Sequence, residues 1–222
     1  LLFTAANWET AQTATVTGVD DDLDDGDIAY TIVTTVSSDD PHYAAIDPAD
    51  VSVTNRDDDA SGVIVNPTTL NLSEPAGTAG FMVTLVAAPV APVTIYLTPN
   101  NGQCTLPANV VLDAGNWQSG APVIVTAVDD TVDDGAQVCV IQTAATSDDP
   151  AYNGVAVDDV TVTVADDDVG GIAVSKLVSV ATANVSDAVV YAFRVTNTGT
   201  VLLNNVSAID DKLGAVALDT TS

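Results

Sequence analysis

Aspartate clusters are the feature of this sequence that points most directly to chemistry. Val128–Gly135 reads VDDTVDDG and Val19–Gly26 reads VDDDLDDG, and each octapeptide follows an apolar run typical of a strand. Carboxylates held this close repel one another by roughly 1 kcal/mol per pair even in water. A hard divalent cation, which takes about six to eight oxygen ligands, relieves that repulsion. We therefore expect these loops to bind Ca²⁺.

Further acidic residues repeat this character elsewhere in the chain. Glu74 lies in the sequence LSEPAG, and runs of three aspartates occupy Asp57–Asp59 and Asp166–Asp168. The short side chain of aspartate suits both tight turns and metal-binding loops, so service as turn residues alone is the alternative. The predicted calcium ligands are Asp20, Asp21, Asp24, Asp25, Asp57, Asp58, Asp59, Glu74, Asp129, Asp130, Asp133, Asp134, Asp166, Asp167 and Asp168.

The charge of the chain argues against two classes of partner. The formal net charge is −27, with 31 acidic residues against only four Lys and Arg. Such a chain repels nucleic acid and anionic membranes, so we expect neither nucleic-acid binding nor membrane insertion. Salt adaptation also produces acidic surfaces, but it would use glutamate about as freely as aspartate. Glu9 and Glu74 are the only glutamates, which favours metal binding.

An internal repeat contains the acidic loops. Trp8 and Trp117 are 109 positions apart, and the same shift superposes the two octapeptides and the two Asp runs without a gap. Self-similarity at a fixed period indicates an array of like domains. We predict the second half of one unit over residues 1–59, a complete unit over 60–168 and a different unit over 169–222.

Alternation of apolar and polar residues predicts an all-β fold. Val160, Val162 and Val164 alternate with threonines, and no segment shows a helical period. Strands are predicted for the complete unit at 69–73, 81–87, 93–98, 104–112, 122–128, 137–144 and 158–165, and elsewhere at 28–36, 189–196 and 202–209. Short strands separated by Gly- and Pro-containing turns are typical of a β-sandwich.

Strand order predicts where the acidic segments lie. If successive strands alternate in direction, the loops after the first, third and fifth strands and the end of the seventh share one pole. Glu74, the loop 129–134 and Asp166–Asp168 would meet there. The loop with Asp148 and Asp149 would lie at the opposite pole and face Asp57–Asp59 of the preceding unit. Calcium would then bind at the junctions between units.

These three acidic segments resemble the calcium-binding Calx-β family. The resemblance rests on Glu74 in LSEPAG, the VDDTVDDG loop and the terminal ADDD, and it covers residues 1–168. It implies tandem immunoglobulin-like or Calx-β-like sandwiches with calcium at the acidic pole. Residues 1–59 lack the half that would supply a glutamate, and Thr131 replaces Asp22 of the first copy. The two sites therefore need not bind equal numbers of ions.

The composition changes after Asp168. Val169–Gly171 is predicted to be a short linker, and Asn197–Gly199 a turn between two strands. The sequence YAFRVTNTG followed by NNVSAIDD resembles the conserved repeat of bacterial and archaeal surface proteins. That resemblance implies an immunoglobulin-like fold, of which residues 169–222 would be the first part.

Cysteine usage suggests the compartment. Cys104 and Cys139 lie in the same predicted unit, and an even count suits an oxidising compartment, whereas two buried free thiols are the alternative. We expect an extracellular or cell-surface location.

No serine–histidine pair, phosphate loop or thiolate–histidine metal constellation occurs, so we expect no enzyme. The remaining functions are a calcium-stiffened stalk, surface layer or filament, and an adhesin for a glycan or another cell. An aromatic content of 5% favours the first, because binding sites use aromatic or Arg anchors. The expected partners are copies of the chain or adjacent repeats. Strand addition at exposed edges is one route, and completion by flanking residues of the same polypeptide is the alternative.

Overall fold

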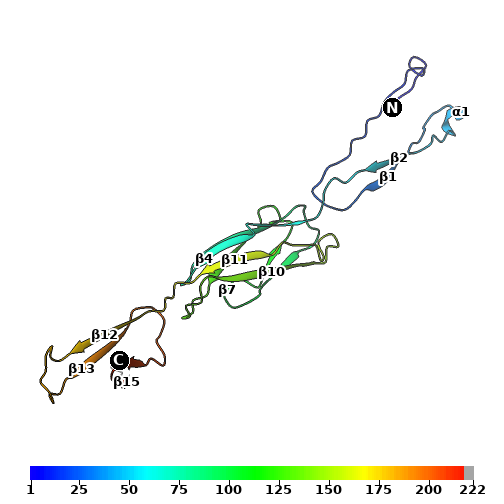
Figure 1. The fold of residues 1–222 in the computed structure, drawn as a ribbon. Coiled ribbons are helices and arrows are strands. Elements are labelled where there is room, and N and C mark those ends of the chain that lie inside the picture. Colours follow the sequence, from blue (N-terminus) through cyan, green and yellow to red (C-terminus); the bar gives the residue numbers. More distant parts are fainter. Residues whose placement is uncertain (218–222) are drawn as a thin grey trace.

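The computed structural model describes residues 1–217, and these are almost entirely β-structure. Fifteen strands and one short helix follow one another along the described chain. Figure 1 shows three parts: an N-terminal part with β1, α1 and β2, a central part with β3–β11, and a C-terminal part with β12–β15. The predicted all-β class is confirmed.

The central part is a sandwich of two sheets. Its strands are β3 Val63–Asn66, β4 Thr69–Ser73, β5 Thr78–Leu85, β6 Val93–Pro99, β7 Cys104–Thr105, β8 Asn109–Leu112, β9 Ala121–Ala127, β10 Gln137–Ser147 and β11 Val160–Ala165. One sheet has the order β4-β11-β10-β6-β8 and the other β3-β5-β9-β7. Only β4 and β11 pair in parallel. This confirms the predicted β-sandwich.

The hydrophobic core lies between these two sheets. Val160, Val162 and Val164 of β11 are buried, while the threonines between them face outward. In the other sheet, Val123 and Val125 of β9 are buried and Ile124 between them is exposed. Burying one such side chain contributes about 1.5–3 kcal/mol. All residues of the core cluster lie between Val65 and Val164, so the central sandwich has a core of its own.

One strand prediction for this unit was wrong, and one strand was missed. Residues 104–112 were predicted as one strand but form β7 and β8, which pair with β9 in one sheet and β6 in the other. Pro107 lies between them, and proline has no N–H to donate to a continuous ladder. Strand β3 was not predicted, although it pairs with β5 at the edge of the four-stranded sheet.

The N-terminal part repeats one hairpin of the central sandwich. It contains β1 Ile28–Ile32, α1 Pro41–Ala44 and β2 Val51–Asn55. Ile28 pairs with Asn55 in this hairpin, and Gln137 pairs with Val164 in the β10–β11 hairpin. The register is therefore the same after the 109-residue shift. Strand β1 ends at Ile32, four residues before the predicted end at 36.

Four strands form the C-terminal part. They are β12 Ile172–Val178, β13 Tyr191–Asn197, β14 Ala208–Asp210 and β15 Gly214–Val216. The predicted strand at 189–196 is confirmed as β13, and β12 was not predicted. The predicted strand at 202–209 is wrong, because Asn205 has φ 55 and this left-handed conformation interrupts an extended chain. Residues 218–222 of the predicted third unit lie outside the described residues.

Lys176 connects the two hairpins of the C-terminal part. Its ammonium forms an ion pair with Asp210 and lies 4.6 Å from the centroid of the Tyr191 ring. The Asp210 side chain is buried, and two backbone N–H groups of the following turn donate to its other oxygen. Most large apolar residues of this part are exposed, so the ion pair is a principal fixed contact within it.

We predict that this ion pair makes the stability of the C-terminal part depend on pH at both extremes. The hydrogen bond with Lys176 lowers the pKa of Asp210. The stability contributed by ionised Asp210 is therefore present above about pH 4 and lost as pH falls. The hydrogen bond with Asp210 raises the pKa of Lys176. The stability contributed by protonated Lys176 is therefore present below about pH 10 and lost as pH rises. Hydrogen exchange of the β12–β13 amides measures both limbs.

The double variant Lys176→Met, Asp210→Asn is the control for this prediction. It removes both titrating groups without leaving one buried charge alone, so both limbs of the pH profile should flatten. An unchanged profile in the double variant would show that other groups cause the dependence.

Candidate metal centre

Parallel pairing of β4 and β11 brings two acidic segments to one end of the sandwich. Ser73 is opposite Ala165 in this pair, and both strands end there in the same direction. Glu74 follows the first strand and Asp166–Asp168 follows the second, so the two segments leave the sheet side by side. A backbone hydrogen bond of 3.0 Å from the Glu74 N–H to the Ala165 carbonyl fixes their relative position.

Four carboxylates converge at this end, and we call them the acidic cluster: Glu74, Asp166, Asp167 and Asp168. Each supplies an oxygen, and these oxygens all lie within 4.8 Å of one another. Calcium binds oxygen at about 2.3–2.6 Å, so two of its ligand atoms are at most about 5 Å apart. The spacing therefore suits one shared cation.

Two buried oxygen-bearing groups in the acidic cluster lack a partner for their charge. Glu74 is only 8% exposed, yet none of the three ion pairs among residues 1–217 includes it. The Oδ2 atom of Asp168 is buried and has no hydrogen-bond partner. Burying such a group without a partner is unfavourable. A cation that prefers oxygen ligands would give both Glu74 and the Asp168 Oδ2 atom a partner, so the residues present fit Ca²⁺.

Glu74 also experiences strong like-charge repulsion. Removal from water raises its pKa, and the negative charges of neighbouring carboxylates raise the pKa further: Asp130, Asp166, Asp129 and Asp167. The VDDTVDDG loop therefore acts on the acidic cluster electrostatically, as well as lying beside it. At neutral pH this field attracts a divalent cation.

Backbone hydrogen bonds hold the VDDTVDDG loop against the Asp run. The Oδ2 atom of Asp166 accepts from the N–H groups of Asp134 at 3.0 Å and Gly135 at 2.7 Å. Its Oδ1 atom accepts from the Asp168 N–H at 2.8 Å. The donors of Asp168 and Gly135 in particular lower the pKa of Asp166 and keep it ionised. Gly135 has φ +71, a conformation that glycine adopts without strain.

The structure thus brings together the three predicted segments, but it gives their residues different positions. Only the acidic cluster has oxygens within the common 4.8 Å among residues 1–217. Asp129 and Asp130 influence Glu74 by charge. Asp133 accepts a hydrogen bond of 2.8 Å from the Gly170 N–H, so it contacts the linker to the next part. Asp134 supplies its backbone N–H. Calcium ligation by these four residues stays a prediction.

A second group of carboxylates in the N-terminal part repeats this arrangement. Asp57 accepts from the N–H groups of Gly26 at 2.6 Å and Asp59 at 2.9 Å, as Asp166 does from the equivalent residues. Burial raises the pKa of Asp59, and further carboxylates then raise it too: Asp57, Asp58, Asp22 and Asp20. Asp20, Asp21, Asp25 and Asp57–Asp59 line a cavity of about 50 Å³. Asp24 accepts from the Ser61 N–H at 2.6 Å.

The prediction for the opposite pole needs a correction. Asp149 is 4% exposed, and its carboxylate accepts from the N–H groups of Val90 at 2.8 Å and Ala151 at 3.0 Å. The Ala151 bond lies within the loop of Asp149, and the Val90 bond joins this loop to the connection between β5 and β6. The preceding unit meets this pole through the VDDDLDDG loop rather than through Asp57–Asp59, because the Ala88 N–H donates to the Asp22 carbonyl at 2.7 Å. A cavity there has both apolar and acidic walls, formed by Leu23, Asp24, Asp25, Ala88, Val90 and Asp149–Tyr152.

Sequence reasoning missed Thr200, which contacts the acidic cluster from the next part of the chain. Its hydroxyl donates to the Oδ1 atom of Asp168 at 2.9 Å, although 32 positions separate the two residues. No local pattern marks such a threonine, because the contact depends on the β12–β13 hairpin, which returns the chain to the linker.

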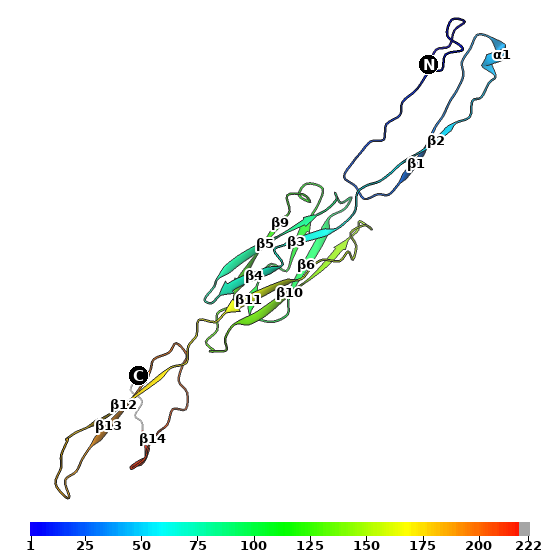
Figure 2. The same cartoon turned by 45° about the horizontal axis from the view of Figure 1, so that its top comes forward.

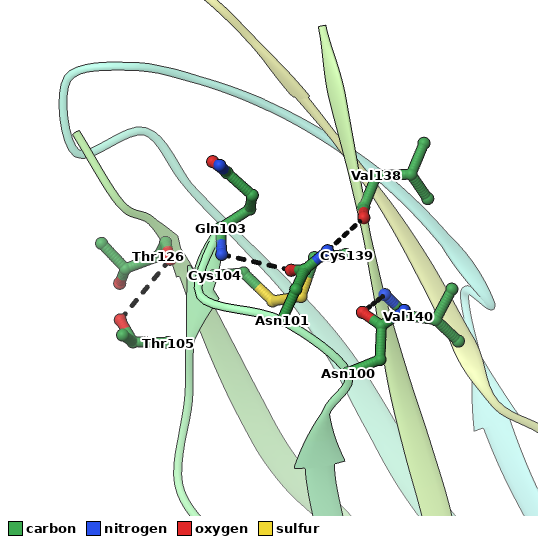
Figure 3. The surroundings of a disulfide bond; sticks show 9 residues. All are labelled: Asn100, Asn101, Gln103, Cys104, Thr105, Thr126, Val138, Cys139 and Val140. Carbon is green, nitrogen blue, oxygen red and sulfur yellow. Dashed lines mark hydrogen bonds between the residues drawn. A yellow bond between two sulfur atoms is a disulfide. The ribbon is translucent and has the colours of Figure 1, made fainter. Parts of the chain in front are cut away.

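A disulfide bond joins the two sheets beside the acidic loop. Cys104 of β7 is bonded to Cys139 of β10 (Figure 3), and no cysteine is free. Both residues are buried in the core. The sequence alone did not decide between a disulfide and two free thiols, and the structure has the disulfide. The bond is compatible with an extracellular or periplasmic location. No helix among residues 1–217 has the length and apolar character needed to cross a bilayer.

No protein-family model matches this chain, and no curated protein matches it. Solved structures with a weak likeness include the periplasmic chaperone SfaE, with a TM-score of 0.38, 10% identity, and coverage of 47% of this chain and 57% of the chaperone. The apo form of the Calx CBD1 domain has a TM-score of 0.36 and 15% identity, with coverage of 48% of this chain and 96% of that domain. WR4, a C. elegans MSP family member, has a TM-score of 0.31 and 17% identity, with coverage of 47% of this chain and 96% of that protein. Scores this low assign neither a family nor a function.

Proposed function

We propose that this chain is a structural segment of an extracellular stalk, surface layer or filament, in which bound Ca²⁺ stiffens a row of β-units. The acidic cluster carries the proposal, since Glu74 and the Asp run meet where the central sandwich leads into its neighbour. The assignment of residues 1–168 to Calx-β-like units, and of the following residues to a surface-protein repeat, is part of this proposal.

The position of the acidic cluster supports a mechanical role. Asp168 directly precedes the linker Val169–Gly171, and Asp133 holds that linker through the Gly170 N–H. Without a counter-ion, the carboxylates repel one another and push the segments apart. Shared coordination supplies attraction between Glu74 and the Asp run. The end of β11 would then be tied to the end of β4, and the linker would leave the sandwich in one direction.

The arrangement of the parts also supports this role. In Figure 2 the N-terminal part, the central sandwich and the C-terminal part follow one another along one line. Each junction lies beside an acidic loop, so stiffness at the junctions determines the stiffness of the row. Extracellular calcium modules bind at about 10⁻⁴ to 10⁻³ M, which keeps such sites occupied outside cells.

Small-angle X-ray scattering of the chain 1–222 tests this function. We expect millimolar calcium to give a longer and narrower particle than chelator does, because the junctions stop bending. Magnesium at the same concentration should have a smaller effect, since it dehydrates reluctantly and demands octahedral geometry. The variant with Asp129→Asn, Asp130→Asn, Asp133→Asn and Asp134→Asn should lose the part of the response that comes from the junction after the central sandwich. Identical scattering with calcium and with chelator would contradict the proposal and direct attention to glycan and cell binding.

A further inference from the structure

Thr200 is held in one orientation between the linker and the acidic cluster. Its hydroxyl donates to the Oδ1 atom of Asp168 at 2.9 Å and accepts from the Val169 N–H at 2.8 Å. Its own N–H donates to the Val169 carbonyl at 2.9 Å. With its hydroxyl and its N–H both engaged, this residue cannot rotate freely, and it therefore fixes the carboxylate that it contacts.

That carboxylate is a member of the acidic cluster. Asp168 has one oxygen engaged by Thr200 and the other, Oδ2, buried without a hydrogen-bond partner. A hydrogen bond to one oxygen orients the whole planar group and leaves the second oxygen for another ligand. This is the arrangement of a metal ligand and its outer-shell partner.

Close backbone contacts hold the turn Thr198–Thr200 of the C-terminal part against the linker Val169–Gly171, and we call this docking the seating of the C-terminal part. A Cβ atom on Gly199 would overlap the carbonyl oxygen of Val169, and a Cβ on Gly171 would lie 2.7 Å from the Thr198 hydroxyl oxygen. Only glycine permits this approach. The Thr198 N–H also donates to the Gly171 carbonyl at 3.1 Å. The turn that carries Thr200 is therefore positioned by several contacts.

We propose that Thr200 is a positioning residue for the cation site of the central sandwich, so that cation binding and the seating of the C-terminal part strengthen each other. This inference rests on the proposed calcium binding. Linkage requires the coupling to be reciprocal: the factor by which seating raises the calcium affinity equals the factor by which calcium favours seating. Outer-shell partners typically change metal affinity by about 10–100-fold.

The other junction lacks this coupling. There the following unit contacts the preceding one through the Ala88 N–H and the Asp22 carbonyl. Among residues 1–217, no side chain of the following unit donates to Asp59, the equivalent of Asp168. Calcium binding in the N-terminal part should therefore be insensitive to changes at Thr200.

Calorimetric titration of the chain 1–222 with calcium chloride tests the inference. Thr200→Val removes the hydroxyl at constant shape and should weaken binding at the acidic cluster about 10-fold. Thr200→Ser keeps the hydroxyl and should restore the affinity to within about 2-fold of the wild type. Thr198→Val lies in the same turn but does not contact Asp168, and it should bind like the wild type.

Hydrogen exchange of the Val169 amide gives a second readout, because that N–H donates to Thr200. Calcium should slow its exchange in the wild type and in Thr200→Ser, but much less in Thr200→Val. The unfolding midpoint of the central sandwich in chelator should be the same in all variants, since its core lies outside this junction. If the wild type binds no calcium, the proposed function fails and the inference fails with it. If the wild type binds calcium and Thr200→Val binds it equally well, only the inference is overturned.

Discussion

Calcium is expected to raise the unfolding temperature of the central sandwich substantially. A ligand that binds only the folded state adds about 2.7 kcal/mol at one hundred times its dissociation constant. The physical reason is that Ca²⁺ relieves the repulsion around Glu74 and gives the buried oxygen of Asp168 a partner. Thermal unfolding followed by circular dichroism, with millimolar calcium and with chelator, measures the effect.

Substitution of Glu74 by glutamine should have opposite effects in the two conditions. In chelator, Glu74→Gln removes a carboxylate whose pKa is raised by burial and by its neighbours, so the variant should be more stable than the wild type. In calcium, the variant lacks a ligand and should lose much of the gain. Glu9→Gln is the matched control, since Glu9 is exposed and is the only other glutamate.

The pH dependence in chelator follows from the same raised pKa. Folded Glu74 binds its proton more tightly than unfolded Glu74, so its ionisation destabilises the fold. The stability advantage of Glu74→Gln over the wild type should therefore grow as pH rises from about 4.3, the ordinary value for glutamate, through the raised pKa. An advantage independent of pH, or a calcium response that Glu74→Gln retains in full, would refute the role given to this residue.

Loss of the Cys104–Cys139 bond is expected to lower the free energy of unfolding by about 3–4 kcal/mol. The two cysteines are 35 positions apart, and closing a loop of this length in the unfolded chain accounts for this magnitude in the chain-entropy model. Urea unfolding of the double variant Cys104→Ala, Cys139→Ala measures the loss. A loss below about 1 kcal/mol would show that the bond adds little to the core packing around it.

The disulfide also bears on the acidic loop. Cys104 pairs with Ala127, the residue directly before Val128 where the VDDTVDDG loop begins. Removing the bond frees β7 from β10 and so loosens the strand end that carries the loop. We therefore expect the double alanine variant to need more calcium than the wild type for half-maximal stabilisation.

Local patterns in the sequence were sufficient for the class of fold and for much of the strand layout. The alternation of valine and threonine in β11 repeats every two residues, and this period is a property of the strand itself. The 109-residue repeat was equally secure, because equal sequences formed equal hydrogen bonds: Gly26 to Asp57 and Gly135 to Asp166. Which acidic segments share an end followed from strand order.

Only the tertiary structure decided which acidic residues share a site and which hold the backbone. The parallel pairing of β4 with β11 places Glu74 beside Asp166, and no local pattern contains that pairing. Asp149 is held by the Val90 N–H from 59 positions away, and Asp168 is held by Thr200 from 32 positions away. The bond between Cys104 and Cys139 likewise depends on two sheets facing each other. Composition and period describe single elements, whereas these roles depend on contacts between elements far apart in the chain.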